Sequence, residues 1–173
     1  MSTCLYDLSV ASYIQSVGAV SAFLQKGKSH CGKNNIDLDE VVATQLYPDM
    51  APFRFQIISV VHHSLGTVKA LESGEFGPPS GFPDHDFEGL QGMLVETLES
   101  LQKCSKEDIN SLESNDVTFR FGDISMPFTA PNFVLSFSLP NVNFHAATAY
   151  NILRIKGVPV GKRDFMGMPR MKA

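Results

Sequence analysis

The sequence lacks the features that would place the chain in a membrane or outside the cell. No apolar run approaches the roughly 20 residues that a transmembrane helix needs. The first residues, MSTCLYD, lack the basic start and apolar core of a secretory signal. The three cysteines, Cys4, Cys31 and Cys104, are widely spaced, so neither a disulfide framework nor a CxxC zinc or redox motif is expected. We therefore expect no membrane contact and a reducing, cytoplasmic compartment.

Positive charge is also scarce. The 14 Lys and Arg are outnumbered by 18 Asp and Glu, which gives a formal net charge of −4, and the basic residues are scattered. Nucleic-acid binding needs a basic surface that follows the phosphates, so no nucleic-acid partner is expected. The glycine- and proline-rich segment 77–81 has neither the spacing nor the following Lys-Ser/Thr of a phosphate-binding loop.

The chain does contain enough apolar residues for one core. With 173 residues, of which 43% are hydrophobic and 18% charged, it has the composition of a globular protein rather than a disordered one. That length suits one domain and is short for two. We therefore expect a single domain over residues 1–173, of which about 160–173 form an extended tail.

Apolar residues recur at helical spacing in four segments. Four long helices are expected, over residues 6–31, 51–71, 86–103 and 131–156. Gly32 is expected to end the first of them, and Pro140 to kink the last, because a proline removes one helical hydrogen bond. A short acidic helix should begin near residue 37 and stop before Pro48.

The remaining segments complete the expected architecture. Residues 73–84 are rich in Gly and Pro and should form an irregular loop. Residues 117–121 and 124–126 flank a Gly-Asp turn and should form a short hairpin. Four amphipathic helices with one long crossover loop predict an all-α four-helix bundle with a short β-hairpin before the last helix.

Two histidines fall where a polar side chain can face the interior. On the second long helix, His63 lies at the margin of the apolar stripe, whereas His62 lies on roughly the opposite side. On the fourth, Asn141 and His145 lie one turn apart on an otherwise apolar face. Each imidazole suits a metal ligand or a general acid/base, and a core histidine with a satisfied hydrogen bond is the structural alternative.

The other histidines and the phenylalanines carry weaker signals. His30 lies at a helix end and suits a cap or dipole role, and His85 lies in the glycine- and proline-rich loop and should be solvated. The 13 phenylalanines are mostly expected in the core. Four of them could also wall a cavity for an aromatic ligand: Phe53, Phe133, Phe137 and Phe144.

Several stretches together resemble one family. They are LYPDM at 46–50, VHH at 61–63, LPNVNFH at 139–145, TAY at 148–150 and GVPVGKRDF at 157–165. In this order, and over nearly the whole chain, they are similar to an uncharacterised bacterial and fungal family grouped with the DinB and YfiT-like metalloenzymes. The resemblance implies a DinB-like four-helix bundle that is often dimeric, so a homodimer is expected.

The resemblance also implies a metal site. In better-known relatives three histidines bind a divalent metal, one on the second helix and an HxxxH pair on the fourth. By position His63, rather than His62, matches the first and His145 matches the last, so these two are the expected ligands for Zn²⁺, Ni²⁺ or Fe²⁺. The remaining position is Asn141, whose amide is a weaker ligand than imidazole. Asp49, before the second long helix, would complete the site or cap that helix.

Three functions remain open. The first is a small-molecule enzyme in which His63 and His145 form an acid/base pair, assisted by Asn141 and Tyr150. It would carry out an isomerisation, dehydration or cyclisation on an apolar or aromatic substrate. The second is a metal-dependent enzyme, such as the thiol-cofactor transferases among DinB-like relatives. The third is a non-catalytic ligand-binding or stress-related module whose two histidines hydrogen-bond each other. Six further side chains are expected to contact the small molecule: Tyr47, Asp49, Phe53, Phe137, Phe144 and Thr148.

Overall fold

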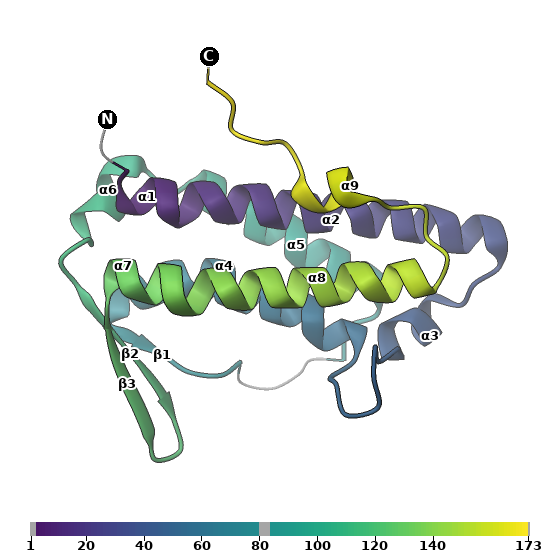
Figure 1. Ribbon diagram of the computed structural model, residues 1–173, viewed down its shortest axis with the longest axis horizontal. Helices are drawn as coiled ribbons and strands as arrows, with labels where there is room; N and C mark the ends of the chain where they lie inside the picture. The colour runs from purple at the N-terminus through teal and green to yellow at the C-terminus, as the bar shows by residue number, and fades with distance from the viewer. Residues whose placement is uncertain (1–2, 80–83, 173) are drawn as a thin grey trace.

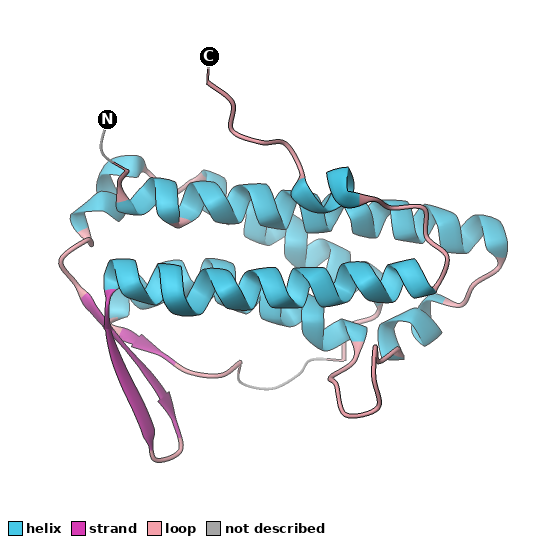
Figure 2. Ribbon diagram, viewed as in Figure 1, coloured by secondary structure: helices cyan, strands magenta, loops and turns pink. Residues whose placement is uncertain are grey.

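Four long helices form the body of the protein, with a small sheet at one end of the bundle (Figure 1; Figure 2). The computed structural model describes residues 3–79 and 84–172. The long helices are α2 (Val10–Asn34), α4 (Phe53–Ser73), α5 (Phe87–Gln102) and α8 (Leu139–Ile155). Both α2 and α4 pack on α5 and on α8, so one core lies between all four. Within the described residues, no helix is long and apolar enough to cross a bilayer.

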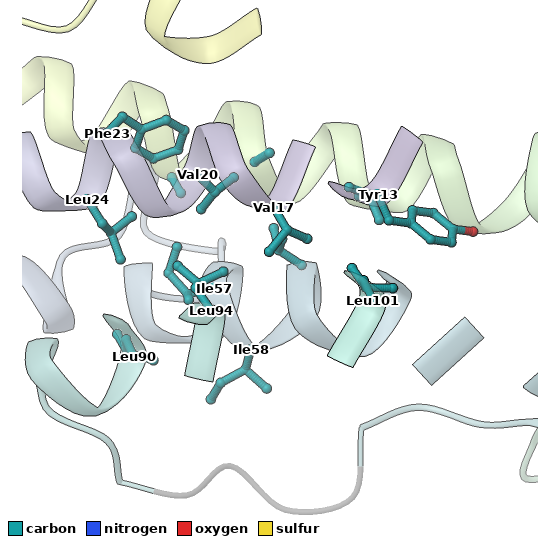
Figure 3. Close-up of a cluster of buried hydrophobic side chains, with 14 of the residues drawn as sticks. Tyr13, Val17, Val20, Phe23, Leu24, Ile57, Ile58, Leu90, Leu94 and Leu101 are labelled. Carbon is teal, nitrogen blue, oxygen red and sulfur yellow. The ribbon is translucent and has the colours of Figure 1, made fainter. Parts of the chain in front are cut away.

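The core is built from the inward faces of these helices. Its side chains include Tyr13, Val17, Val20, Phe23 and Leu24 of α2, Ile57 of α4, and Leu90, Leu94 and Leu101 of α5 (Figure 3). All of them are essentially inaccessible to solvent. Burying an aliphatic or aromatic side chain of this size stabilises a fold by about 1.5–3 kcal/mol. The expected periodicity of the helices is therefore confirmed as the source of the core.

Short helices connect or flank the long ones. They are α1 (Leu5–Leu8), α3 (Leu38–Ala43), α6 (Lys106–Ser111), α7 (Ala130–Asn132) and α9 (Lys162–Met166). Asp37, Asp86 and Ser105 cap α3, α5 and α6, each accepting a hydrogen bond from a backbone N–H in the first turn. The first expected helix is interrupted at Ser9, and it does not end at Gly32, because α2 continues to Asn34 and ends on the left-handed Asn35.

The last long helix is irregular just before Pro140, where the sequence predicted a kink. A six-residue π-helix, η1 (Phe133–Ser138), lies directly before α8, and Pro140 occupies the first turn of α8. Proline has no N–H to give the carbonyl one turn earlier, so a regular α-helix would lose a hydrogen bond there. The wider π turn moves the bonding to residues five apart, as in the bond from Leu139 N–H to the carbonyl of Val134.

The sheet joins the crossover loop to the hairpin. Strand β2 (Asp116–Phe121) pairs antiparallel with β3 (Ile124–Thr129), which confirms the hairpin before the last long helix. Strand β1 (Glu75–Phe76) pairs parallel with β2, with Phe76 opposite Phe119. The expectation of an irregular loop over 73–84 is therefore wrong at β1, and residues 80–83 lie outside the described residues.

The C-terminal segment is more ordered than an extended tail. Val158 and Val160 are buried, and α9 packs on α2, so the expectation for about 160–173 is wrong at Lys162–Met166. Asp164 accepts a hydrogen bond from the N–H of Gly161 at 2.8 Å and helps to start this helix. The local capping interaction and the apolar contacts of Val158 and Val160 hold the segment against the bundle.

Substitutions at Gly74 and Gly32 test where helices α4 and α2 end. Gly74 ends α4 with φ of 78°, a conformation that strains any residue with a Cβ, so Gly74→Ala should lower the free energy of unfolding by about 1 kcal/mol. Gly32 lies inside α2, where a Cβ would meet no atom within 4 Å. Gly32→Ala should therefore raise it by up to about 1 kcal/mol. Urea unfolding followed by circular dichroism measures both. A destabilised Gly32→Ala would contradict the helix boundary described above.

Candidate functional site

The structure brings His63 and His145 together between α4 and α8. Their ring centroids lie 5.9 Å apart and the ring planes differ by 15°. His63 is only 8% exposed, as expected for the inward-facing member of the His62-His63 pair. His145 is partly buried on the facing helix. The pairing follows from the packing of α4 on α8, because each histidine lies on the face that its helix presents to the other.

Aromatic rings surround the two imidazoles. The ring of His63 lies 5.4 Å from that of Phe76 and 5.8 Å from that of Phe137. The ring of His145 has Phe55 at 5.6 Å and Phe144 at 5.2 Å, both in edge contacts. Phe137 and Phe144 therefore lie at the site, as expected, whereas the roles of Phe55 and Phe76 were not foreseen. The rings make the surroundings of both histidines apolar.

Gln56 fixes the orientation and the tautomer of His145. Its Oε1 lies 2.8 Å from Nδ1 of His145, and its Nε2 donates to the carbonyl of Ala51 at 2.8 Å. Since the amide nitrogen is used as a donor, Oε1 is the acceptor, and Nδ1 of His145 must carry the proton. The second ring nitrogen, Nε2, is then left with a free lone pair. Gln56 lies on the same face of α4 as His63, and helical phase alone could have identified it.

A buried hydrogen-bond network holds the backbone of His63. Ser138 Oγ donates to the carbonyl of His63 at 2.6 Å, and the hydroxyl of Tyr13 lies 2.6 Å from Ser138 Oγ. Thr67 Oγ1 lies 2.8 Å from the same carbonyl and 2.9 Å from Ser138 Oγ. Because Ser138 gives its single proton to the carbonyl, Tyr13 donates to Ser138. The network joins α2, α4 and η1 at one point.

The side chain of His63 is less satisfied than its backbone. Within the described part of the chain, Nδ1 of His63 is buried and has no hydrogen-bond partner. A buried N–H without an acceptor is rarer than an unused lone pair, which favours the tautomer with a bare Nδ1 and a proton on Nε2. His63 would then present an N–H donor, whereas His145 presents a lone pair.

The apolar surroundings keep both imidazoles neutral. Burial and, to a smaller extent, charge repulsion from His62 and His145 lower the pKa of His63 to about 3. Burial alone lowers the pKa of His145 to about 4. Neither group carries a charge at neutral pH. Strongly shifted pKa values on two facing groups are typical of functional sites, although structural histidines show them as well.

His62 does not face away from the site as the helical phase predicted. Its Nε2 donates to the carbonyl of Gly77 at 2.7 Å, and its ring lies 4.5 Å from Phe76 and 5.3 Å from His63. Burial lowers its pKa, and the bond to Gly77 opposes that shift. The crossover loop and β1 cover part of this side of α4, so His62 is partly buried beside His63.

The two expected assistants of the histidines have other partners. Tyr150 donates to the carbonyl of Val160 at 3.3 Å, and its ring contacts Phe23 and Phe165. Five residues after His145 the helix has turned by about 140°, which places Tyr150 on the side of α2 and α9. Asn141 Nδ2 donates to the carbonyl of Phe137 at 2.7 Å, where it satisfies a carbonyl of the π turn. Neither side chain is placed to act with the histidines.

Four of the six expected contact residues lie elsewhere. Phe53 is fully buried and stacks on Phe87 in the core, and Thr148 is buried with its hydroxyl donating to a carbonyl of its own helix. Tyr47 is 66% exposed and Asp49 lies exposed in the same turn. The cap of α4 is Pro52, so Asp49 is not the helix cap either. The sequence positions of these four residues did not show where their side chains would point.

The donor set does not fit a tightly bound divalent metal. A stable site needs three or four imidazole, thiolate or carboxylate ligands. Residues 3–79 and 84–172 contain no group of three His, Cys, Asp or Glu side chains that could hold an ion. The amide of Asn141 already serves the backbone of η1, and Asp49 is exposed in the turn before α4. His63 and His145 are thus left as two ligands without a third.

A cavity lies beside the histidines, not between them. It has a volume of about 430 Å³ and is lined by Ala51, Pro52, Arg54, Phe55, Ile58 and Asp84. Phe55 lines this cavity and also contacts the ring of His145. Arg54 pairs with Asp84 at the edge of the cavity. A small apolar molecule in this space would lie next to the His145 side of the cluster.

Comparisons with known proteins match nearly the whole chain. A family model described as "Domain of unknown function (DUF1993)" matches residues 5–166. A crystal structure of a DinB family member protein from Shewanella denitrificans matches with a TM-score of 0.81 and 24% sequence identity, covering 98% of this chain and 95% of that one. This likeness confirms the DinB-like fold and, at that identity, the fold alone. Comparison with curated proteins gives no match.

The lowered pKa values predict that acid destabilises the fold. Well above pH 6.5, histidines are neutral in both folded and unfolded chains and contribute nothing to the pH dependence. As the pH falls towards about 4, the unfolded chain binds protons that His63 and His145 in the folded chain do not. The free energy of unfolding should therefore fall by about 2 kcal/mol for each of these two groups, or about 4 kcal/mol together, between pH 6.5 and 4.5.

Urea unfolding at a series of pH values measures this dependence. His63→Gln and His145→Gln should each lower the slope of the free energy of unfolding against pH, over that range, by the equivalent of up to one bound proton. His85→Gln, outside the cluster, is the control variant. A curve for His145→Gln with the wild-type slope would show that the site does not hold His145 neutral.

Proposed function

The chain belongs to the DUF1993 family, and from that membership and the geometry of the site we propose that it is a small-molecule enzyme in which His145 acts as a general base and His63 as a neutral hydrogen-bond donor. The reaction is an isomerisation, with dehydration or cyclisation as variants of the same proton transfer, on an apolar or aromatic substrate. The observation that carries the proposal is the Gln56–His145 hydrogen bond beside a stacked, neutral His63.

The state of His145 suits a base. Oε1 of Gln56 accepts a hydrogen bond from the Nδ1–H of His145, which fixes the ring and leaves the lone pair on Nε2 free. A side chain that orients a catalytic base acts in this way in other enzymes. With a pKa of about 4 the imidazole is unprotonated at neutral pH but is only weakly basic. It therefore suits a substrate with an already acidic C–H group, such as one on a carbon between a carbonyl and an aromatic ring.

The state of His63 suits an electrophile. With a pKa of about 3, the imidazole of His63 remains neutral at neutral pH. Its Nε2–H can donate a hydrogen bond to an oxygen on which negative charge develops. The backbone network from Ser138 and Thr67 holds the residue in place. The fixed donor needs no rearrangement as the charge forms.

The proposed proton transfer balances without any co-reactant. Nε2 of His145 takes a proton from carbon, the C–H electron pair moves into a new C=C bond, and the carbonyl π pair moves onto oxygen. His63 holds that oxygen by a hydrogen bond. The imidazolium of His145 then returns the proton to the oxygen, or to a second carbon in a double-bond shift. The aromatic rings around the site favour a flat, apolar substrate.

The two competing functions fit the site less well. A metal-dependent thiol transferase needs a third ligand, and the described residues bring none to the histidine pair. A ligand-binding module remains the second candidate, favoured by the dense aromatic lining. No hydrogen bond joins the two described imidazoles: Nδ1 of His145 bonds to Gln56, and Nδ1 of His63 has no partner among the described residues. A bound ligand that never turns over would identify that function.

Phenylpyruvate is a suitable probe, because its acidic carbon lies between a carbonyl and a phenyl ring. The protein should accelerate the exchange of its C3 protons in D₂O, followed by proton NMR. His145→Gln should lower that rate about 10²- to 10⁴-fold and His63→Phe about 10²-fold, whereas His85→Gln should leave it unchanged. A wild-type rate in His145→Gln would refute the base. Saturable binding without exchange would favour the binding module.

Gln56→Glu tests the orienting bond separately. A carboxylate next to Nδ1 favours the imidazolium, so the pKa of His145 should rise. The acid limb of the exchange rate against pH should then shift upward by about one unit or more, while circular dichroism shows an intact fold. An unmoved pH profile would show that Gln56 does not contact the group that titrates in the reaction.

A further inference from the structure

A second hollow lies between α2 and the C-terminal segment. It has a volume of about 640 Å³, within the range of sites for small ligands. Its floor is the outer face of α2, formed by Ala11, Ile14, Gly18 and Ala22, and Met168 lies at its edge. It shares no lining residue with the histidine cluster or with the 430 Å³ cavity beside it.

Specific contacts hold the C-terminal segment over α2. Gln15 Nε2 donates to the carbonyl of Met166 at 2.9 Å. Gly167 adopts a φ of 63°, and a Cβ at this position would lie 3.1 Å from Cβ of Ala19. Further along, Arg170 donates to the carbonyl of Asp7 at 2.9 Å and to Ser12 Oγ at 3.2 Å. The segment therefore forms one wall of the groove at two separated points.

The floor of the groove is open as well as apolar. A Cβ built at Gly18 meets no atom within 4 Å, so the space above this turn of α2 is empty of protein. Ala22 is exposed, and Met168 is 77% exposed. Apolar side chains that line a hollow and remain uncovered favour an apolar ligand, because filling the hollow removes their surface from water.

The charge around the groove is positive in a chain of net charge −4. Lys26, Arg163 and Arg170 line it, and Asp164 is its one acidic lining residue. Lys26 is paired with Asp164. Among residues 3–79 and 84–172, Arg170 donates only to an uncharged carbonyl and an uncharged hydroxyl, and Arg163 forms no ion pair. Within that part of the chain, the two guanidinium charges therefore have no paired anion. Guanidinium groups bind carboxylates in paired hydrogen bonds.

We propose that this groove binds a small amphiphilic carboxylate, with its chain on the Ala11–Ala22 face of α2 and its carboxylate on Arg170 or Arg163. The apolar floor accounts for the chain, and the two uncompensated guanidinium groups account for the anionic head. This site is independent of the proton-transfer site proposed above, because the two have no residue in common.

Octanoate and its neutral analogue octanamide are the matched probes. Titration calorimetry should show octanoate binding at least about tenfold more tightly than octanamide, because only the carboxylate can pair with a guanidinium group. The ε-methyl NMR signal of Met168, identified by its loss in Met168→Leu, should shift on binding. That readout places the ligand in the groove without reference to any catalytic activity.

Variants with matched controls locate the site. Gly18→Leu should fill the open floor and abolish binding, and because the position is helical and uncrowded the fold should be retained. Gly92→Leu, at an equally open position on α5, should bind octanoate as the wild type does. Arg170→Gln should weaken octanoate about tenfold and leave octanamide unchanged. Arg120→Gln, on β2, should change neither affinity.

Three results would overturn the proposal. Equal affinities for octanoate and octanamide would remove the role of the cations. Unchanged octanoate binding in both Gly18→Leu and Ala22→Leu would remove the groove. Light scattering that shows a wild-type dimer and a monomeric Gly18→Leu, with no octanoate binding to either, would assign the groove to a second copy of the chain.

Discussion

The hydrogen bond from Ser138 to the backbone carbonyl of His63 is the contact on which the site depends. It joins the end of the π turn to the middle of α4, and Tyr13 brings α2 to the same point. The bond is buried, where an unpaired hydroxyl or carbonyl is costly, so the three segments are held in one relative position. If Ser138 moved by one residue along its helix, the register between α4 and α8 would be lost. This hydrogen bond to the backbone of His63 therefore supports the packing of α4 on α8 that makes the two imidazoles face each other.

Sequence reasoning succeeded where burial decides the outcome and failed where long-range pairing does. Helical phase placed His63 and His145 on inward faces, because an apolar stripe must face the core. The same phase could not place His62, because its cover is Phe76, whose strand pairs with a segment far along the chain. Tyr150 was expected to assist the histidines, but its helical angle separates it from His145 and its hydroxyl donates to the carbonyl of Val160.

Asn141 shows why position within a family motif does not transfer a role. The relatives described by the resemblance have a metal-binding histidine there, whereas this chain uses the amide to satisfy the carbonyl of Phe137 in η1. A short amide side chain can donate to a carbonyl one turn earlier on its own helix, and here it does so at the end of η1. The residue that would have completed a metal site thus stabilises the backbone that positions His145. A shared fold leaves the chemistry of its site free to differ.

The parallel pairing of β1 with β2 bears on how the histidines are covered. Phe76, which covers both His62 and His63, belongs to a strand of two residues that is too short to persist without its partner. That partner follows α5 and α6 in the chain, so the pairing closes a long loop and has a high entropic cost before it is made. The cover on this flank of the histidines therefore depends on the strand pairing as well as on the packing of α4 against α8. Opening the sheet would let water reach His62 and His63 even while the four long helices stay packed.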